Sequence, residues 1–197
     1  MRIFKSSGAD VEECLKNLEE ETDLDRDRFF YRTYNEEDTL VLEAVRIDET
    51  SSYGAALLKV FLKNFNIDGN VETKVRDGQI NYCIHSSNNS ILIGKKGHIL
   101  DALHKYIRQA IYTETDIYPA VVLDVEGYKE KQTFFIEKEA KKLAREVQET
   151  KIDVKMQPMS AFDRKTIHNV LSTFKNIKTE STGTEPNRCV VIKYKED

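Results

Sequence analysis

The first 50 residues combine a helical spacing of apolar residues with a strand-like pattern. Between Val11 and Leu18 the apolar residues stand at i, i+3, i+4 and i+7, which predicts a helix with one buried face and with Asp10 as its N-cap. Residues 29–34 and 39–47 are rich in aromatic and β-branched side chains, and the polar residues between them favour a turn. We therefore expect a small α/β unit built from a helix and a hairpin.

The middle of the chain begins with a helical pattern and then changes to a period of two. Apolar residues at helical spacing run from Ala55 to Phe65. Residues 71–75 and 80–84 then alternate between apolar and polar on either side of an Asp-Gly pair. This pattern predicts a hairpin, because Asp-Gly readily adopts the positive backbone angles of a tight turn.

A glycine-flanked turn follows the hairpin. The apolar run Ile91-Leu92-Ile93 leads into Gly94-Lys95-Lys96-Gly97, and a long helix is expected from near His98. Residues 119–125 have the pattern of a buried strand, so the predicted order is helix, strand, strand, helix, helix, strand. The apolar residues expected on one face of the long helix are Leu100, Leu103, Ile107 and Ile111.

The last third of the chain predicts two further helices and two strands. An amphipathic helix covers residues 128–150, and Ser160 is the expected N-cap of a second helix that ends near Phe174. Residues 154–157 and 189–192 are expected to be strands. The predicted fold class is α+β, with three small α/β units at residues 1–50, 51–127 and 128–197.

Charge is distributed unevenly along the 197 residues. The formal net charge is −4, but residues 1–50 hold 7 Lys and Arg against 15 Asp and Glu, a net of −8. The remaining residues hold 23 against 19, a net of +4. A mildly basic body can bind phosphates locally even when the whole chain is acidic.

Two absences narrow the class of protein. The N-terminus lacks the apolar run of a signal peptide, and no stretch approaches the roughly 18 apolar residues of a membrane span. We therefore expect a cytoplasmic protein. The three cysteines are far apart and lack the spacing of a zinc site, so they are interpreted as reduced core residues, and no metal or cofactor is expected.

The Gly94-Lys95-Lys96-Gly97 turn has the chemistry of a phosphate site. Glycines allow a ligand backbone to approach closely, and the N–H groups at the start of the following helix point towards the same turn. The alternative is that Lys95 and Lys96 occupy an ordinary solvated turn.

This turn and the element order around it resemble a type II KH domain over about residues 51–126. The resemblance implies a loop that clamps the backbone of single-stranded RNA, beside a groove lined by aliphatic side chains. Leu103 is either part of this groove or part of the core. The residues expected to contact RNA are Ile93, Gly94, Lys95, Lys96, Gly97, His98 and Ile99.

In the last unit, Arg164 and His168 lie four residues apart, on one face of the predicted helix. Such a pair could hold one phosphate, because Arg offers a bidentate fork and His can donate a hydrogen bond. The surrounding residues 158–164 and 185–192 resemble the R-three-H domain, which is associated with single-stranded nucleic acid. The resemblance implies that Arg164 and His168 are its signature pair, with Arg188 as a further basic contact. The alternative for His168 is a packed histidine.

A type II KH domain followed by an R-three-H domain, after a small N-terminal unit, resembles the Jag family, also called the EloR or KhpB family. The resemblance implies regulation of cell elongation, division or sporulation in bacteria, with a small KH protein as partner. Two features differ from the family pattern. Tyr34-Asn35-Glu36-Glu37-Asp38 stands where a basic Lys-Lys-Gly-Phe segment is often found, and the usual long linker before the KH domain is nearly missing.

These features favour non-catalytic binding of single-stranded RNA, or of single-stranded DNA, through two linked modules. The alternative is an adaptor whose residues 1–50 dock a membrane-associated or cell-wall partner. A nuclease with His168 as general base and Asp163 beside it is a third hypothesis. It ranks low because the sequence shows no cluster of carboxylates suited to two metal ions.

Overall fold

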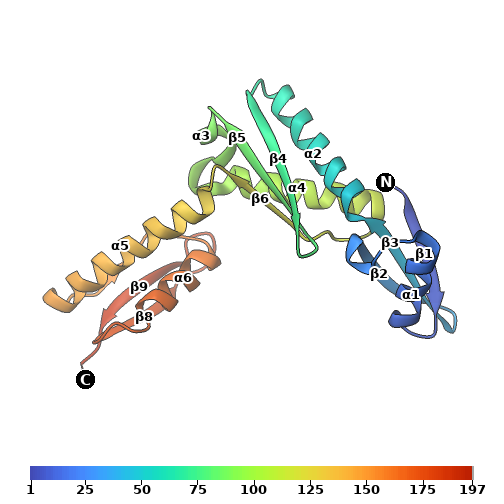
Figure 1. Ribbon diagram of the computed structural model, residues 1–197. Coiled ribbons are helices and arrows are strands. Elements are labelled where there is room, and N and C mark those ends of the chain that lie inside the picture. Colours follow the sequence, from blue (N-terminus) through green and yellow to red (C-terminus); the bar gives the residue numbers. More distant parts are fainter. Residues whose placement is uncertain (197) are drawn as a thin grey trace. The chain divides into compact units, whose positions relative to one another are not determined.

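The computed structural model describes residues 1–196 and divides the chain into two compact units, residues 1–127 and 128–197. Figure 1 shows an α+β fold in which each of three small sheets is accompanied by helices. Two of the sheets belong to the first unit and the third to the second unit. Within residues 1–196, no helix is both long and apolar enough to cross a membrane. The predicted fold class is confirmed, whereas the three domain boundaries stay a prediction.

The N-terminal sheet is antiparallel, with the strand order β1-β3-β2. It consists of β1 (Ile3–Gly8), β2 (Phe29–Glu36) and β3 (Thr39–Arg46), and helix α1 (Val11–Thr22) packs against it. A short 3-10 turn, η1 (Arg26–Arg28), precedes β2. The predicted helix and hairpin are confirmed. The sequence pattern did not reveal β1, because its centre is the polar run Lys5-Ser6-Ser7.

Both the cap and the core of this unit follow from the local sequence. The Asp10 carboxylate accepts a hydrogen bond from the backbone N–H of Glu13 at 2.9 Å, which confirms Asp10 as the N-cap. The buried side chains of α1 meet those of the sheet in one cluster. That cluster contains Cys14, Leu15, Leu18, Phe29, Leu42 and Ala44.

Strand β3 continues into helix α2 (Ile47–Asn64) without a loop. The sequence had placed Ile47 at the end of the strand, and that prediction was wrong. Asp48 and Glu49 favour a helix start at this point because their carboxylates lie in the first turn, where the helix dipole is positive. The Thr50 hydroxyl also donates to the carbonyl of Arg46 at 2.8 Å. A β-branched residue such as Ile47 fits either element, so its identity could not fix the boundary.

The second sheet has the order β4-β5-β6, with β4 (Gly69–Arg76) antiparallel and β6 (Val121–Val125) parallel to the central β5 (Gln79–Ser86). Asp77 and Gly78 both have positive φ angles, 49° and 68°, as a tight hairpin turn requires. Between β5 and β6 lie α3 (Asn89–Ile93), the 3-10 turn η2 (Lys95–Gly97) and α4 (His98–Thr115). The predicted order from helix α2 to strand β6 is confirmed.

The two faces of this sheet differ in burial. On β5, Ile80, Tyr82 and Ile84 are fully buried, whereas Asn81 and Cys83 alternate with them and are only half-buried. Contacts with the flanking strands place α2 against β4 and α4 against β6. One face is therefore covered by helices and the other is open. On α4, the predicted buried residues Leu100, Leu103, Ile107 and Ile111 are at most 4% exposed.

The second unit packs two helices on an antiparallel sheet with the order β7-β9-β8. Its elements are α5 (Tyr128–Thr150), β7 (Val154–Lys155), α6 (Ala161–Leu171), β8 (Ile177–Thr182) and β9 (Cys189–Tyr194). The Ser160 hydroxyl accepts from the N–H of Asp163, which confirms it as an N-cap. The sequence pattern missed β8, whose residues are mostly polar, and placed the end of α6 three residues too late.

Gly54 shows how tightly α2 packs on the second sheet. The Tyr82 hydroxyl donates to the carbonyl of Ser51 at 2.9 Å, and a β-carbon at Gly54 would lie 2.2 Å from that hydroxyl oxygen. We expect Gly54→Ala to lower the free energy of unfolding by about 1–3 kcal/mol, because the overpacking outweighs the better helix propensity of alanine. Urea denaturation would measure it, with Ser52→Ala on the exposed face of α2 as the control. Equal stability of Gly54→Ala and wild type would contradict the close approach.

Candidate nucleic-acid interface

The backbone of the loop between α3 and α4 depends on its glycines. Gly94 has φ 68° and ψ −174°, a region that is essentially restricted to glycine. A β-carbon at this position would also lie 2.5 Å from Cγ1 of Ile99. Gly97 has φ 83° and Lys96 has φ 54°, so the loop contains three residues with positive φ. These angles fold the loop back against the first turn of α4.

The side chains of this loop point into solvent at the start of a long helix. Lys95, Lys96 and His98 are exposed, and Ile99 is 43% exposed. Gly97 is the N-cap of α4 and offers no capping side chain. Of the N–H groups in the first turn, that of His98 donates to the carbonyl of Lys95, and no side chain caps the others. Two cations beside a helix N-terminus form a suitable site for phosphate.

The aliphatic residues around the loop separate into core and surface. Ile93 is half-buried and Leu92 is 1% exposed, whereas Ile91 is 55% exposed. Leu103 is only 4% exposed, so it belongs to the core and not to an open groove. Sequence reasoning treated residues 91–93 as one apolar run, and such a run does not show which side chain faces outward.

The predicted pair on α6 is held by neighbouring residues of its own unit. Arg164 is 7% exposed, and its Nη2 donates to Oε1 of Glu185 at 2.5 Å. Its Nε is buried and has no hydrogen-bond partner among the described residues. Leaving a buried N–H donor without an acceptor costs free energy. An incoming acceptor at Nε would recover part of that cost.

His168 lies between two hydroxyl groups of β8. Its Nδ1 is 2.6 Å from Oγ1 of Thr179, and its Nε2 is 2.9 Å from Oγ of Ser181. Burial lowers the pKa of His168, and the neighbouring Arg164 charge lowers it further. The lowered pKa favours the neutral form of His168, and the two hydroxyl contacts fix the orientation of its ring. Sequence reasoning could not name these two partners, because β8 itself was not foreseen.

The remaining predicted residues of this unit have different environments. Arg188 is exposed, on the same loop as Glu185. Asp163 is 8% exposed and accepts a hydrogen bond from Nε2 of Gln132 at 3.3 Å. Within residues 1–196, no three His, Cys, Asp or Glu side chains gather closely enough to hold a metal ion.

A histidine on the open face of the β4-β5-β6 sheet was not foreseen. Nε2 of His85 lies 3.2 Å from Oε2 of Glu72, and its Nδ1 lies 3.1 Å from Oε1 of Glu126. The hydrogen bond with Glu72 raises the pKa of His85, and that with Glu126 raises it further. The three residues come from β4, β5 and the turn after β6, so only strand pairing brings them together.

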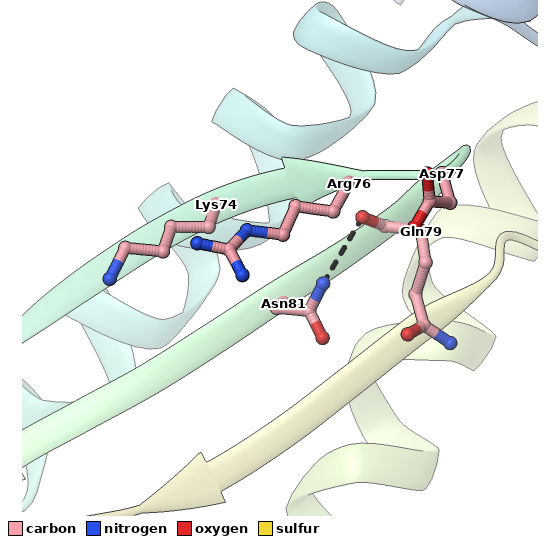
Figure 2. Close-up of a pocket in the computed structure, with 5 residues that line it drawn as sticks. All are labelled: Lys74, Arg76, Asp77, Gln79 and Asn81. Carbon is pink, nitrogen blue, oxygen red and sulfur yellow. Dashed lines mark hydrogen bonds between the residues drawn. The ribbon is translucent and has the colours of Figure 1, made fainter.

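An open pocket of about 470 Å³ lies near the turn of the β4–β5 hairpin. Figure 2 shows Lys74 and Arg76 extending along β4, with Gln79 and Asn81 on the neighbouring strand. Asp77 also lines the pocket, and Lys74 forms an ion pair with Glu72 at 2.7 Å. Two positive and two negative charges cancel here, so this pocket is a poorer anion site than the glycine loop.

The pKa values of the two histidines should depart from the ordinary value of 6.5 in opposite directions: that of His85 is raised and that of His168 is lowered. For His85, the raised pKa means that its contribution to stability is complete below pH 6.5 and is lost as the pH rises through the folded pKa. For His168, the lowered pKa means that its contribution is complete above pH 6.5 and is lost as the pH falls through the folded pKa. NMR titration of the ring protons would measure both values, with His85→Gln and His168→Gln for assignment. A Glu72→Gln variant should lower the pKa of His85, and an unchanged value would contradict the hydrogen bond with Glu72.

Comparison with protein families identifies two domains. The family model of the KH domain matches residues 56–132, and the model of the R-three-H domain matches residues 135–194. The first match contains the glycine loop and its sheet, and the second contains Arg164, His168 and Arg188. The order of the two domains along the chain is the predicted one.

Several curated proteins named RNA-binding protein KhpB are similar to this chain. The protein from Clostridium symbiosum is 34% identical over 134 residues, which is 68% of this chain and 60% of that protein. The chain therefore matches less than two thirds of the length of that relative. The protein from Bacillus subtilis is 28% identical over 212 residues, covering 99% of this chain and 100% of that protein. Consecutive KH and R-three-H domains, together with this match along the whole length, show that the chain belongs to the Jag family, also called the KhpB family.

Proposed function

We propose that the protein binds single-stranded RNA without catalysis and that the loop at residues 94–97 is its main contact. The backbone of this loop carries the proposal, because positive φ angles at Gly94, Lys96 and Gly97 present two exposed lysines at the uncapped start of α4. Gly94 is half-buried and Gly97 is buried, so the contact would fall on the two lysines and on the start of α4, where phosphates can accept hydrogen bonds from backbone N–H groups. The names of the relatives, RNA-binding protein KhpB, support the same ligand class.

The strand would continue from the loop along exposed aliphatic side chains. Ile91 and Ile99 flank the loop and are 55% and 43% exposed, so unstacked bases can lie against them. Ile93 is half-buried behind them and His98 is exposed beside them. These residues bind through contact and charge, a mode that needs no metal or cofactor.

The R-three-H domain would supply a second phosphate contact. Arg188 is exposed and available directly. Arg164 would contribute if a phosphate replaced Glu185 as its partner. The phosphate could then accept hydrogen bonds from Nη2, which now bonds Glu185, and from Nε, which has no partner in the described part of the chain. Two modules on one chain raise the effective concentration of the second contact, so modest affinities combine.

The described geometry favours binding over catalysis in the second unit. Both ring nitrogens of His168 are engaged by Thr179 and Ser181, and Asp163 is buried against Gln132. A general base must reach the proton that it abstracts. We propose that His168 positions β8 against α6 and takes no part in proton transfer.

The cellular role rests on family resemblance alone. We propose that the protein is a cytoplasmic regulator of cell elongation, division or sporulation. Its candidate protein partners are a small KH protein and a membrane-associated protein. Residues 1–50 would contact the latter partner. Their net charge of −8 makes them an improbable site for RNA.

The main test is to reverse the charge of the loop. Lys95→Asp with Lys96→Asp should weaken binding to a labelled pool of twelve-nucleotide single-stranded RNAs at least tenfold and reduce its dependence on salt, because each lost phosphate contact lowers the salt slope by about 0.7. Fluorescence anisotropy at low and moderate salt would measure both effects. Lys59→Asp with Lys63→Asp on exposed positions of α2 is the matched control. Equal weakening by both pairs would argue against a site at the loop.

A second test asks whether Arg164 reaches RNA. Glu185→Gln should strengthen binding roughly fivefold, equivalent to about 1 kcal/mol, because it releases Arg164 from its ion pair. Glu180→Gln is the control, since it removes the same charge from an exposed ion pair with Lys193. If both variants bind equally well, the effect is one of net charge, and Arg164 has a structural role. Both affinities would be measured with the same RNA pool.

A further inference from the structure

We propose that the solvent-facing side of α4, together with Tyr118, forms a second segment of the RNA path in which bases stack on tyrosine rings. This inference rests on the proposed binding of RNA at the glycine loop. It adds a site about two helical turns beyond the loop, with a different chemistry. The ligand class is single-stranded nucleic acid that continues from the loop.

Two exposed tyrosines provide flat surfaces on this side of the helix. Tyr118 lies in the segment between α4 and β6 and stacks on Tyr112 of α4, with ring centroids 4.2 Å apart and planes inclined by 12°. One face of Tyr118 is therefore covered, while the residue as a whole remains 59% exposed. Tyr106 is 52% exposed. Exposed aromatic rings held in place are the usual platforms for unpaired bases.

Cations lie beside these rings. The guanidinium carbon of Arg108 is 5.7 Å from the centroid of the Tyr118 ring. Lys105, Arg108, Tyr106 and Tyr118 line a pocket of about 500 Å³ together with Ala102 and Gln109. Unlike the pocket on the β4–β5 hairpin, this one has no carboxylate among its lining residues. Its two positive charges are thus available to attract phosphates.

The pocket is continuous with the loop along one stripe of the helix. His98, Ala102, Lys105 and Gln109 follow one another at intervals of four, three and four residues, and all are exposed. This stripe lies opposite the buried face of α4. From His98 to Tyr106 the helix rises about 12 Å, a distance that about three or four stacked nucleotides span at about 3.4 Å each. A strand clamped at the loop can therefore reach the tyrosines.

The combination of positive charges and aromatic rings indicates which ligand this face of α4 binds. A protein or lipid surface could use the tyrosines alone, but alternating aromatic and cationic groups match a polymer that alternates bases and phosphates. The stripe begins at the loop already assigned to RNA, so no separate ligand is required. The occupant is therefore the same strand, downstream or upstream of the nucleotides at the loop.

Tyr106 is the residue to change first, because its side chain is half in solvent and alanine favours the helix. Tyr106→Ala should weaken binding of the full chain to the twelve-nucleotide RNA pool by about fivefold to a hundredfold, the range for one base on an aromatic ring. Tyr106→Phe keeps the ring and should restore most of the affinity. Tyr31→Ala, an exposed tyrosine of β2, is the matched control and should have no effect. Circular dichroism and thermal unfolding would check that each variant is folded.

A charge variant provides an independent measurement. Lys105→Gln with Arg108→Gln should lower the salt slope of binding by up to about 1.4, corresponding to two phosphate contacts. If wild type binds RNA and the loop variant does not, but Tyr106→Ala and the charge variant bind as wild type does, the proposed function stands and the second segment is refuted. If wild type fails to bind, both ideas fail. Unchanged RNA affinity with altered sedimentation of Tyr106→Ala would assign this face to a second copy of the chain.

Discussion

The contact between Gly94 and the side chain of Ile99 is the constraint on which the proposed interface depends. It holds the loop against the first turn of α4 and leaves no space for a β-carbon. The same conformation turns Lys95 and Lys96 outward and keeps a capping side chain away from the helix N-terminus. A binding loop usually has to be ordered when its ligand arrives, at a cost in entropy. Here the packing of one isoleucine orders it beforehand.

The β4-β5-β6 sheet supports this arrangement, because the helices on both sides of the loop pack against β6. Tyr82 is fully buried, and its hydroxyl is bonded to the backbone of α2, so the central strand is joined to the helix on its covered face. The opposite face is polar and open, with His85 bridging Glu72 and Glu126. The covered face supplies stability and positions α4, while the open face is left with charges that largely compensate one another.

The acidic N-terminal unit uses part of its charge internally. Glu43 is 6% exposed and lies between Lys5 at 2.8 Å and Arg32 at 2.6 Å. The hydrogen bond with Lys5 and the pair with Arg32 hold the pKa of Glu43 below its usual range. Removal of either cation would leave a buried carboxylate poorly compensated. Most of the other carboxylates of this region are exposed, which gives it a negative surface that repels phosphates.

Local signals let the sequence alone determine much of the protein. Asp10 and Ser160 as helix caps, the Asp77-Gly78 turn and the glycines of the loop each act within three or four residues, so their effects are visible in the printed sequence. Strands β1 and β8 could not be predicted from the sequence pattern, because their residues are mostly polar and gain stability only by pairing with a distant strand. For the same reason, only the tertiary structure showed that Arg164 is buried against Glu185 and that Tyr118 folds back onto α4. Those contacts join residues that the sequence separates, and strand pairing and packing, which no local pattern encodes, bring them together.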